Sequence, residues 1–227
     1  MYQAHFGLKK SLFDGGIAQE EAVYLGPRQQ LIAANFKVAL TTLDSAIVMT
    51  GPAGVGKTTL TSAALRATTT RLALGWLTST PANAHELLEQ LLAEFGFNAH
   101  RVGRVERLQM WRQFLSETAA TNSRVFVIAE CAEELPQELL RALDALTASD
   151  ASGSPGANLV LLGHAVLEEH LKAPFLDSLR QRVRLRQRLE PFALDELREC
   201  LKHRVRAAGG EFERIFGRSR PRPISTP

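Results

Sequence analysis

Short apolar runs alternate with segments of helical periodicity along most of the chain. Each run spans five to seven residues, and the segments between them repeat apolar residues at intervals of three and four. This alternation is typical of βαβ units whose strands lie parallel in one sheet. The five candidate buried strands are Ala46–Thr50, Leu72–Leu77, Val125–Ala129, Leu159–Gly163 and Val183–Leu189.

The helical segments carry recognisable start and stop signals. Asn83 is a suitable N-cap, and Gly96 ends the segment that Asn83 begins. Pro136 opens another segment at a position where proline is compatible with a helix. We expect the apolar stripes of these helices to be core faces rather than binding surfaces. The predicted helices are Pro27–Leu43, Asn83–Phe95, Val105–Ala120, Pro136–Ala148 and Leu194–Ala208.

A glycine-rich turn follows the first strand. Residues Gly51–Thr58 satisfy the G-x-x-x-x-G-K-[ST] pattern, with a strand before them and the helix-compatible Thr59–Leu65 after them. The glycines allow successive N–H groups to point inward around an anion, and the helix N-terminus adds a positive partial charge. We therefore predict an ATP-binding loop; the alternative is a glycine-rich turn that happens to precede a lysine.

Each side chain of the loop has an expected role. Lys57 is expected to bridge the β- and γ-phosphates, and the Thr58 hydroxyl to take a place on Mg²⁺. The residues of this stretch predicted to bind the nucleotide are Gly51, Pro52, Ala53, Gly54, Val55, Gly56, Lys57, Thr58 and Thr59.

A P-loop enzyme also needs an acidic group at the end of a neighbouring strand. The usual pattern is four apolar residues, then Asp, then Glu, and here the strand ends Ala129-Glu130, so that Ala129 takes the Asp position. Glu130 is predicted to act as the general base or to reach Mg²⁺ through water. The alternative is an acidic loop beside a site that binds nucleotide without rapid turnover.

The composition excludes several classes of protein. Of 227 residues, 45% are hydrophobic and 22% charged, which is typical of a globular chain rather than a disordered or collagen-like one. No apolar run approaches the roughly 18 residues of a membrane span, and the start lacks a secretory signal. The two cysteines, Cys131 and Cys200, are expected to be reduced thiols, too few for a zinc site. These features predict a cytoplasmic protein without a transmembrane segment.

The net charge of +3 is concentrated at the end of the chain. From Leu201 onwards, seven basic residues stand against two acidic ones. We expect residues 211–227 to form a disordered basic tail. The alternative is a tail that contacts nucleic acid or anionic lipid.

Several stretches, taken in order, resemble the AAA+ ATPases of the general secretion pathway protein A (ExeA-like) family. The resemblance covers most of Met1–Gly210, and among its motifs only the phosphate-binding loop is specific by itself. The stretches are Met1–Phe13, Tyr24–Gln30, Gly51–Thr58, Val125–Pro136, Leu159–His164, Leu179–Arg186 and Leu201–Gly210.

This resemblance implies the α/β fold of a P-loop NTPase of the AAA+ (ASCE) type, a three-layer sandwich with a five-stranded parallel sheet. Residues 1–210 would be the AAA+ domain, with an N-terminal adenine-side segment and helix in residues 1–44 and the αβα core in residues 45–190. Residues 191–210 would be the remnant of a helical lid that is otherwise mostly missing. Leu25 would lie beside the adenine.

The resemblance also implies roles for three residues outside the loop. His164 takes a sensor position where glutamine is common, and Arg180 or Arg182 takes the position of an arginine that reaches the γ-phosphate of a neighbouring subunit. The alternatives are a histidine that caps the helix Ala165–Leu171 and a solvated basic helix end paired with acidic residues around Glu168.

The predicted function is that of an ATP-binding, slowly hydrolysing AAA+ module of secretion-type ATPases. Its nucleotide state would control weak homo-oligomer formation or association with a partner in a secretion apparatus or the inner membrane. Two alternatives stay open: a regulator of DNA transposition that binds nucleic acid, and a nucleotide-binding scaffold without significant hydrolysis.

Overall fold

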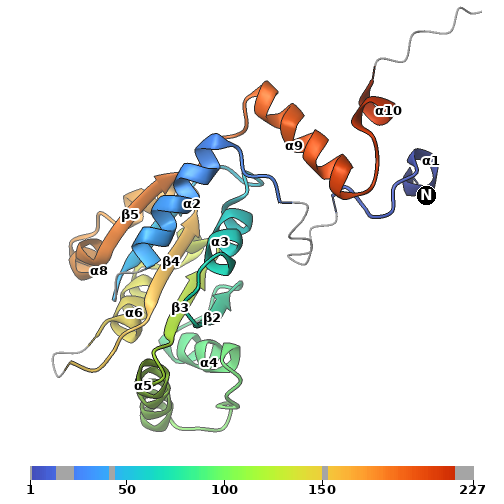
Figure 1. Cartoon of the computed structure of the whole chain (residues 1–227). Helices are drawn as coiled ribbons and strands as arrows, with labels where there is room; N and C mark the ends of the chain where they lie inside the picture. The colour runs from blue at the N-terminus through green and yellow to red at the C-terminus, as the bar shows by residue number, and fades with distance from the viewer. Residues whose placement is uncertain (1, 14–22, 41–43, 150–152, 218–227) are drawn as a thin grey trace, which may run out of the picture. The chain divides into compact units, whose positions relative to one another are not determined.

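The computed structural model describes residues 2–13, 23–40, 44–149 and 153–217 (Figure 1). Contacts divide the chain into two units. The larger unit, Leu31–Pro191, holds the sheet, and the smaller one combines Met1–Gln30 with Phe192–Pro227. The predicted division into an adenine-side segment, a core and a lid remnant stays a prediction.

The sheet of the larger unit has five strands in the order β2-β3-β4-β1-β5, and every adjacent pair is parallel. The five predicted strands are confirmed, with ends that differ by at most one residue. The acidic residue was expected at the end of a strand next to the one that precedes the glycine-rich loop. This expectation needs correction: the strand that ends before Glu130, β3, is not adjacent to β1, because β4 lies between them. The strands are β1 (Ala46–Thr50), β2 (Leu72–Leu77), β3 (Arg124–Ala129), β4 (Asn158–Gly163) and β5 (Val183–Arg188).

Alternate strand residues supply the two buried faces of the sheet, as the two-residue period of a strand requires. On one face, Val48, Val127 and Leu161 belong to the main core cluster, together with Leu91 and Trp111 from the covering helices. The helices that contribute to this layer are α4 (Ala84–Glu94), α5 (Arg104–Ala120), α6 (Gln137–Thr147), α7 (Val166–His170) and α8 (Asp177–Arg182).

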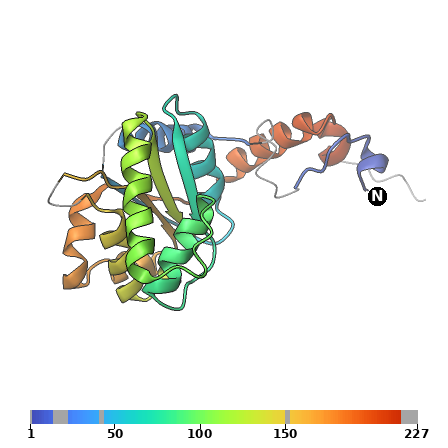
Figure 2. The same ribbon diagram turned by 90° about the horizontal axis from the view of Figure 1, so that it is seen from below.

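Two helices cover the opposite face, as Figures 1 and 2 show: α2 (Pro27–Leu40) and α3 (Lys57–Arg66). The Thr61 hydroxyl of α3 lies 3.9 Å from the Met49 sulfur of β1. Phe36 of α2 is fully buried. Helices, sheet and helices form three layers, so the predicted α/β sandwich with a five-stranded parallel sheet is confirmed.

The helix signals of the sequence are found in the structure. The Asn83 side chain accepts hydrogen bonds from the backbone N–H groups of His85 and Glu86, at 2.9 and 3.1 Å. Gly96 follows the end of α4 with a φ of 84°, a conformation that favours glycine. The helix α6 begins at Gln137, one residue later than predicted, so that Pro136 is its N-cap and not its first residue.

The smaller unit brings together segments from both ends of the chain. Leu8 and Leu12 pack with Val205 and Ala208 in a separate apolar cluster. The Lys9 N–H donates to the Ala208 carbonyl oxygen at 2.8 Å. The unit contains α1 (Tyr2–Phe6), α9 (Leu194–Ala207) and α10 (Phe212–Phe216).

The prediction of a disordered tail differs from the structure at residues 211–217. These residues contain α10, because Phe212 and Ile215 pack against the apolar cluster of the smaller unit. Residues 218–227, with three of the seven basic groups, lie outside the described residues.

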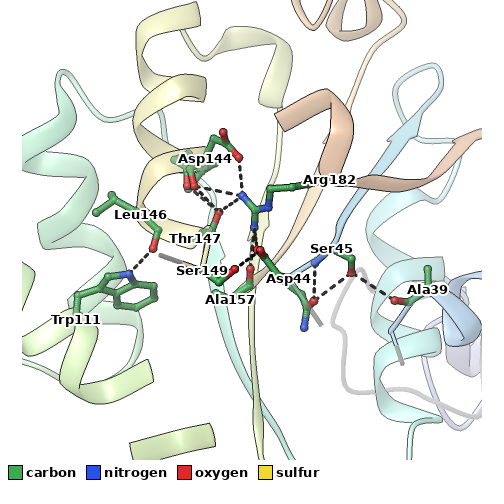
Figure 3. A network of polar contacts seen from close by, with 12 residues as sticks. Ala39, Asp44, Ser45, Trp111, Asp144, Leu146, Thr147, Ser149, Ala157 and Arg182 are labelled. Carbon is green, nitrogen blue, oxygen red and sulfur yellow. Dashed lines mark hydrogen bonds and ion pairs between the residues drawn. The ribbon is translucent and has the colours of Figure 1, made fainter. Parts of the chain in front are cut away.

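Arg182 is the centre of a buried polar network at the amino ends of the strands (Figure 3). Only 9% of Arg182 is exposed. Its Nη1 lies 2.5 Å from Asp144 Oδ1 and donates to Thr147 Oγ1 at 3.1 Å, both on α6. Its Nη2 lies 2.9 Å from Asp44 Oδ1 and donates to the Ala157 carbonyl oxygen at 3.1 Å. One guanidinium thus joins α6 to the chain segments that enter β1, β4 and β5.

Replacing Arg182 by alanine is expected to lower the free energy of unfolding by about 3 kcal/mol or more, because it leaves the buried Asp144 carboxylate unpaired. The matched change Arg180→Ala removes a part-exposed arginine from the same helix and is expected to cost at most about 1 kcal/mol. Urea unfolding of both variants measures the difference. Equal losses would show that the network contributes little.

Candidate nucleotide-binding site

The carboxyl ends of β1, β3 and β4 meet at one edge of the sheet, because all strands run in the same direction. The glycine-rich loop follows β1 directly, Glu130 follows β3, and His164 follows β4. The predicted loop, acidic residue and sensor position therefore share one edge, although more than 100 residues separate the first from the last.

Two glycines allow the loop to take its path. A side chain at Gly51 would place its Cβ 2.7 Å from the Leu189 carbonyl oxygen, so only glycine fits there without a shift. Gly56 has a φ of 97° and directly precedes the first residue of α3. The Gly51 N–H donates to the Gly163 carbonyl oxygen at 3.1 Å, which ties the start of the loop to the end of β4.

The Lys57 ammonium is held by the loop itself. Its Nζ donates to the carbonyl oxygens of Gly51 at 2.9 Å and Pro52 at 3.0 Å. An ammonium has three donors, so these two bonds leave a third. The arrangement holds a positive charge at the N-terminus of α3, where phosphate groups are also favoured.

Thr58 and Glu130 meet across 72 residues of sequence. The Thr58 hydroxyl donates to Glu130 Oε1 at 2.6 Å, a distance typical of a strong hydrogen bond to a carboxylate. The Glu130 N–H donates to the Leu77 carbonyl oxygen at 2.9 Å, so Glu130 continues the pairing of β3 with β2. Glu130 is therefore held in place through both its backbone N–H and its carboxylate.

Ala129 does not occupy the place that the sequence pattern suggested. Its side chain is fully buried in the main core cluster, and it pairs with Leu77 of β2. A carboxylate at this position would point into the apolar layer and not toward Thr58. The side chain that meets Thr58 at this edge is therefore that of Glu130 and not that of residue 129.

Glu133 and His164 form a second polar pair at this edge. His164 Nε2 lies 3.7 Å from Glu133 Oε1, with 49% of the histidine side chain and 11% of the glutamate side chain exposed. Glu133 packs against Gly163, where any side chain would collide with its carboxylate. The N-cap of α7 is Ala165, and no side chain caps this helix. His164 contributes only its backbone carbonyl oxygen, which accepts from the Leu167 N–H at 3.0 Å.

Cys131 is a residue of this edge that sequence reasoning missed. It is exposed, and its φ of 47° is unusual for a residue other than glycine. Partial burial raises the pKa of its thiol, and the carboxylates of Glu133, Glu134 and Glu130 raise it further, while Lys57 acts in the opposite direction. The signal that could have found it is its place directly after Glu130.

The two predicted arginines differ in their surroundings. Arg182 is committed to the buried network, so its proposed reach toward a neighbouring γ-phosphate is wrong. Arg180 keeps 37% of its side chain exposed, where it pairs with Asp177 and donates to the Lys172 carbonyl oxygen at 3.0 Å. The expected pairing with acidic residues around Glu168 is not made by either arginine, because Arg186 takes Glu168 at 2.5 Å.

The remaining predicted positions lie in two places. Leu25 belongs to the smaller unit, where its carbonyl oxygen accepts from Gln30 Nε2 at 2.9 Å, and its role beside the adenine stays a prediction. Within the loop region, the exposed residues are Pro52, Ala53, Gly54 and Thr59, and the half-buried ones are Val55, Gly56, Lys57 and Thr58.

The parallel sheet and the loop at its carboxyl edge define an α/β protein of the P-loop NTPase class. Residues 41–171, more than half of the chain, match the family model described as an AAA domain. The chain belongs to this AAA domain family.

The resemblance to general secretion pathway protein A is also confirmed. The chain is 24% identical over 210 residues to the protein of that name from Aeromonas hydrophila. The match covers 92% of this chain and 38% of the relative, so the chain spans less than two-fifths of that protein's length.

Solved structures with the same fold include three proteins from other organisms. The ADP form of the ORC2 protein of Aeropyrum pernix has a TM-score of 0.65 at 14% identity, over 86% of this chain and 55% of that one. Cdc6p of Pyrobaculum aerophilum has a TM-score of 0.63 at 18% identity, over 88% and 53%. A Walker-type ATPase of Pyrococcus abyssi has a TM-score of 0.61 at 17% identity, over 88% of this chain and 63% of that one.

Among the described residues, no helix combines the length and apolar character needed to span a membrane.

Introducing an aspartate at Ala129 is expected to destabilise the protein rather than repair the site. An unpaired carboxylate inside the core costs about 3 kcal/mol or more. The loss should shrink as the pH falls, because burial raises the pKa of that carboxyl and the neutral form costs less. Urea unfolding of Ala129→Asp and the parent at pH 7 and pH 4.5 measures this. A variant as stable as the parent at pH 7 would contradict the burial of position 129.

Proposed function

We propose that this chain is an ATP-binding and slowly hydrolysing AAA+ module, with Lys57, Thr58 and Glu130 at the phosphates and Mg²⁺. One observation carries the proposal: the 2.6 Å hydrogen bond between Thr58 Oγ1 and Glu130 Oε1. It brings a hydroxyl and a carboxylate together at the N-terminus of α3, beside the Lys57 ammonium.

The donor set fits Mg²⁺. This cation prefers oxygen ligands and keeps several waters, so one hydroxyl and one carboxylate are the contribution expected from the protein when substrate phosphates supply the rest. Bound there, Mg²⁺ would neutralise charge on the phosphate oxygens. Thr58 would bind it directly, and Glu130 would hold Thr58 and a metal-bound water in place.

The other residues of the loop would bind and orient the phosphates. The N–H groups from Gly54 to Thr58 lead into α3, and the Lys57 ammonium keeps a donor for a phosphate oxygen. His164 would respond to the γ-phosphate through its contact with Glu133. Leu25 would contribute an apolar surface to the adenine.

We further propose that nucleotide binding controls association with a second copy or with a partner in a secretion apparatus or the inner membrane. The similarity to general secretion pathway protein A supports this role. Arg180 is the remaining candidate for the arginine that acts across the contact between copies, because Arg182 is buried. A cytoplasmic location agrees with an ATP-dependent role.

Replacing Lys57 by alanine is expected to weaken ATP binding at least about tenfold, or about 1.4 kcal/mol, because it removes the side-chain charge nearest the phosphates. Lys172→Ala, a change of an exposed lysine in the turn after α7, is the control and should leave the affinity unchanged. Titration with a fluorescent ATP analogue at saturating Mg²⁺ measures both. Equal affinities for Lys57→Ala and the parent would reject the assignment of the loop.

Self-association is expected to be weak and to need ATP. Sedimentation velocity should show a monomer without nucleotide and a fraction of larger species with a slowly hydrolysed ATP analogue and Mg²⁺. Arg180→Ala should lose these species, whereas Arg141→Ala, a change of an exposed arginine on α6, should keep them. A monomer under all conditions, with ATPase activity independent of protein concentration, would contradict the shared site.

A further inference from the structure

The bond between Thr58 and Glu130 determines how the acidic pattern is placed on the chain. The usual pattern has a first acidic residue on the metal side and a second one that polarises the attacking water. Because Glu130 meets Thr58, and Ala129 points into the core, the first position falls on Glu130. The second position therefore falls on residue 131, which is a cysteine.

The backbone brings residue 131 to the open edge of the sheet. Cys131 directly follows the residue bonded to Thr58 and is the N-cap of the short helix η2 (Ala132–Glu134). Its φ of 47° turns the chain away from the line of β3, and the side chain is exposed. A carboxylate at this position would stand next to Glu130 at the mouth of the loop.

The nearby carboxylates are not equivalent substitutes. Glu133 is 11% exposed, packs against Gly163 and lies 3.7 Å from His164, so its carboxylate is held under the end of β4. Glu130 already accepts the bond from Thr58. Glu134 is exposed at the far end of η2, three residues beyond Cys131.

We propose that residue 131 is the general-base position of this site, and that Cys131 makes the chain a nucleotide switch that hydrolyses bound ATP only slowly. The proposal rests on the proposed function, since it requires ATP at the loop. It differs from the expectation for the sequence, in which Glu130 was a candidate for the base.

A carboxylate at position 131 supplies the missing proton acceptor. In Cys131→Glu, the new carboxylate takes a proton from water while the water oxygen forms a bond to the γ-phosphorus. The bond between that phosphorus and the β–γ bridging oxygen breaks, and its electron pair leaves with ADP. A positioned general base accelerates such steps by about 100-fold or more, and this is the expected gain in turnover.

The experiment compares Cys131→Glu with Cys131→Gln in the full chain. Both residues have the same size and meet the same left-handed backbone, so the comparison isolates the carboxylate. Affinity for the fluorescent ATP analogue and steady-state phosphate release at saturating ATP and Mg²⁺ are measured on the same samples. The expected result is parent-like affinity in both, a gain of about 100-fold in phosphate release for Cys131→Glu, and none for Cys131→Gln.

Two results would overturn the proposal while leaving ATP binding intact. One is equal phosphate release from the glutamate and glutamine variants. The other is a loss of more than tenfold in phosphate release when Glu133→Gln or Glu134→Gln is made in the parent, which would assign the base to η2. This second test does not depend on the folding of the residue 131 variants. Absence of ATP binding to the parent would instead reject the proposed function itself. The double variant Cys131→Glu/Lys57→Ala should lose the gain, which ties the new activity to this site.

Discussion

The parallel direction of all five strands is the constraint on which the site depends. In a parallel sheet every strand ends at the same edge, so the residues that follow β1, β3 and β4 are brought together without being close in sequence. The order of the strands adds a second condition. Because β4 separates β1 from β3, the loop and Glu130 meet across the end of an intervening strand, and Gly163 at that end leaves room for both the loop contact and Glu133.

The opposite edge of the sheet, where the strands begin, holds a structural network and not the candidate site. There the Arg182 guanidinium joins the segments entering β1 and β4 to α6. A buried guanidinium with two carboxylate partners cannot be released without leaving those carboxylates unpaired. Arg180, two residues earlier on the same helix, has its main ionic partner on the surface and is able to change partners at low cost. The difference in burial therefore assigns Arg182 to the stability of the fold and leaves Arg180 accessible to another molecule.

In the proposed function, the site suits retention of nucleotide better than fast turnover. The Lys57 ammonium, the N-terminus of α3 and the Thr58–Glu130 pair would all act on phosphates and their cation, and these interactions would stabilise bound ATP. Polarisation of water would then need a separate carboxylate, because Glu130 accepts the hydrogen bond from Thr58. A protein that binds ATP firmly and hydrolyses it slowly keeps its ATP-bound conformation for longer. This is a property suited to control of association.

The sequence by itself determined the strands, most helices, the glycine-rich loop and the family, because these depend on local periodicity, caps and a contiguous motif. Asn83 and Gly96 act through neighbours a few residues away, and Gly51–Thr58 is a contiguous motif that is read directly from the sequence. Only the tertiary structure decided the strand order, the burial of Arg182 and the packing of α10, because these depend on contacts between distant segments. The same reason explains why Glu130 and not Ala129 lies beside Thr58: a strand's residues alternate between faces, so neighbouring positions differ between a core side chain and one at the site. Only the contact with Thr58 identifies Glu130 as the residue on the site's side.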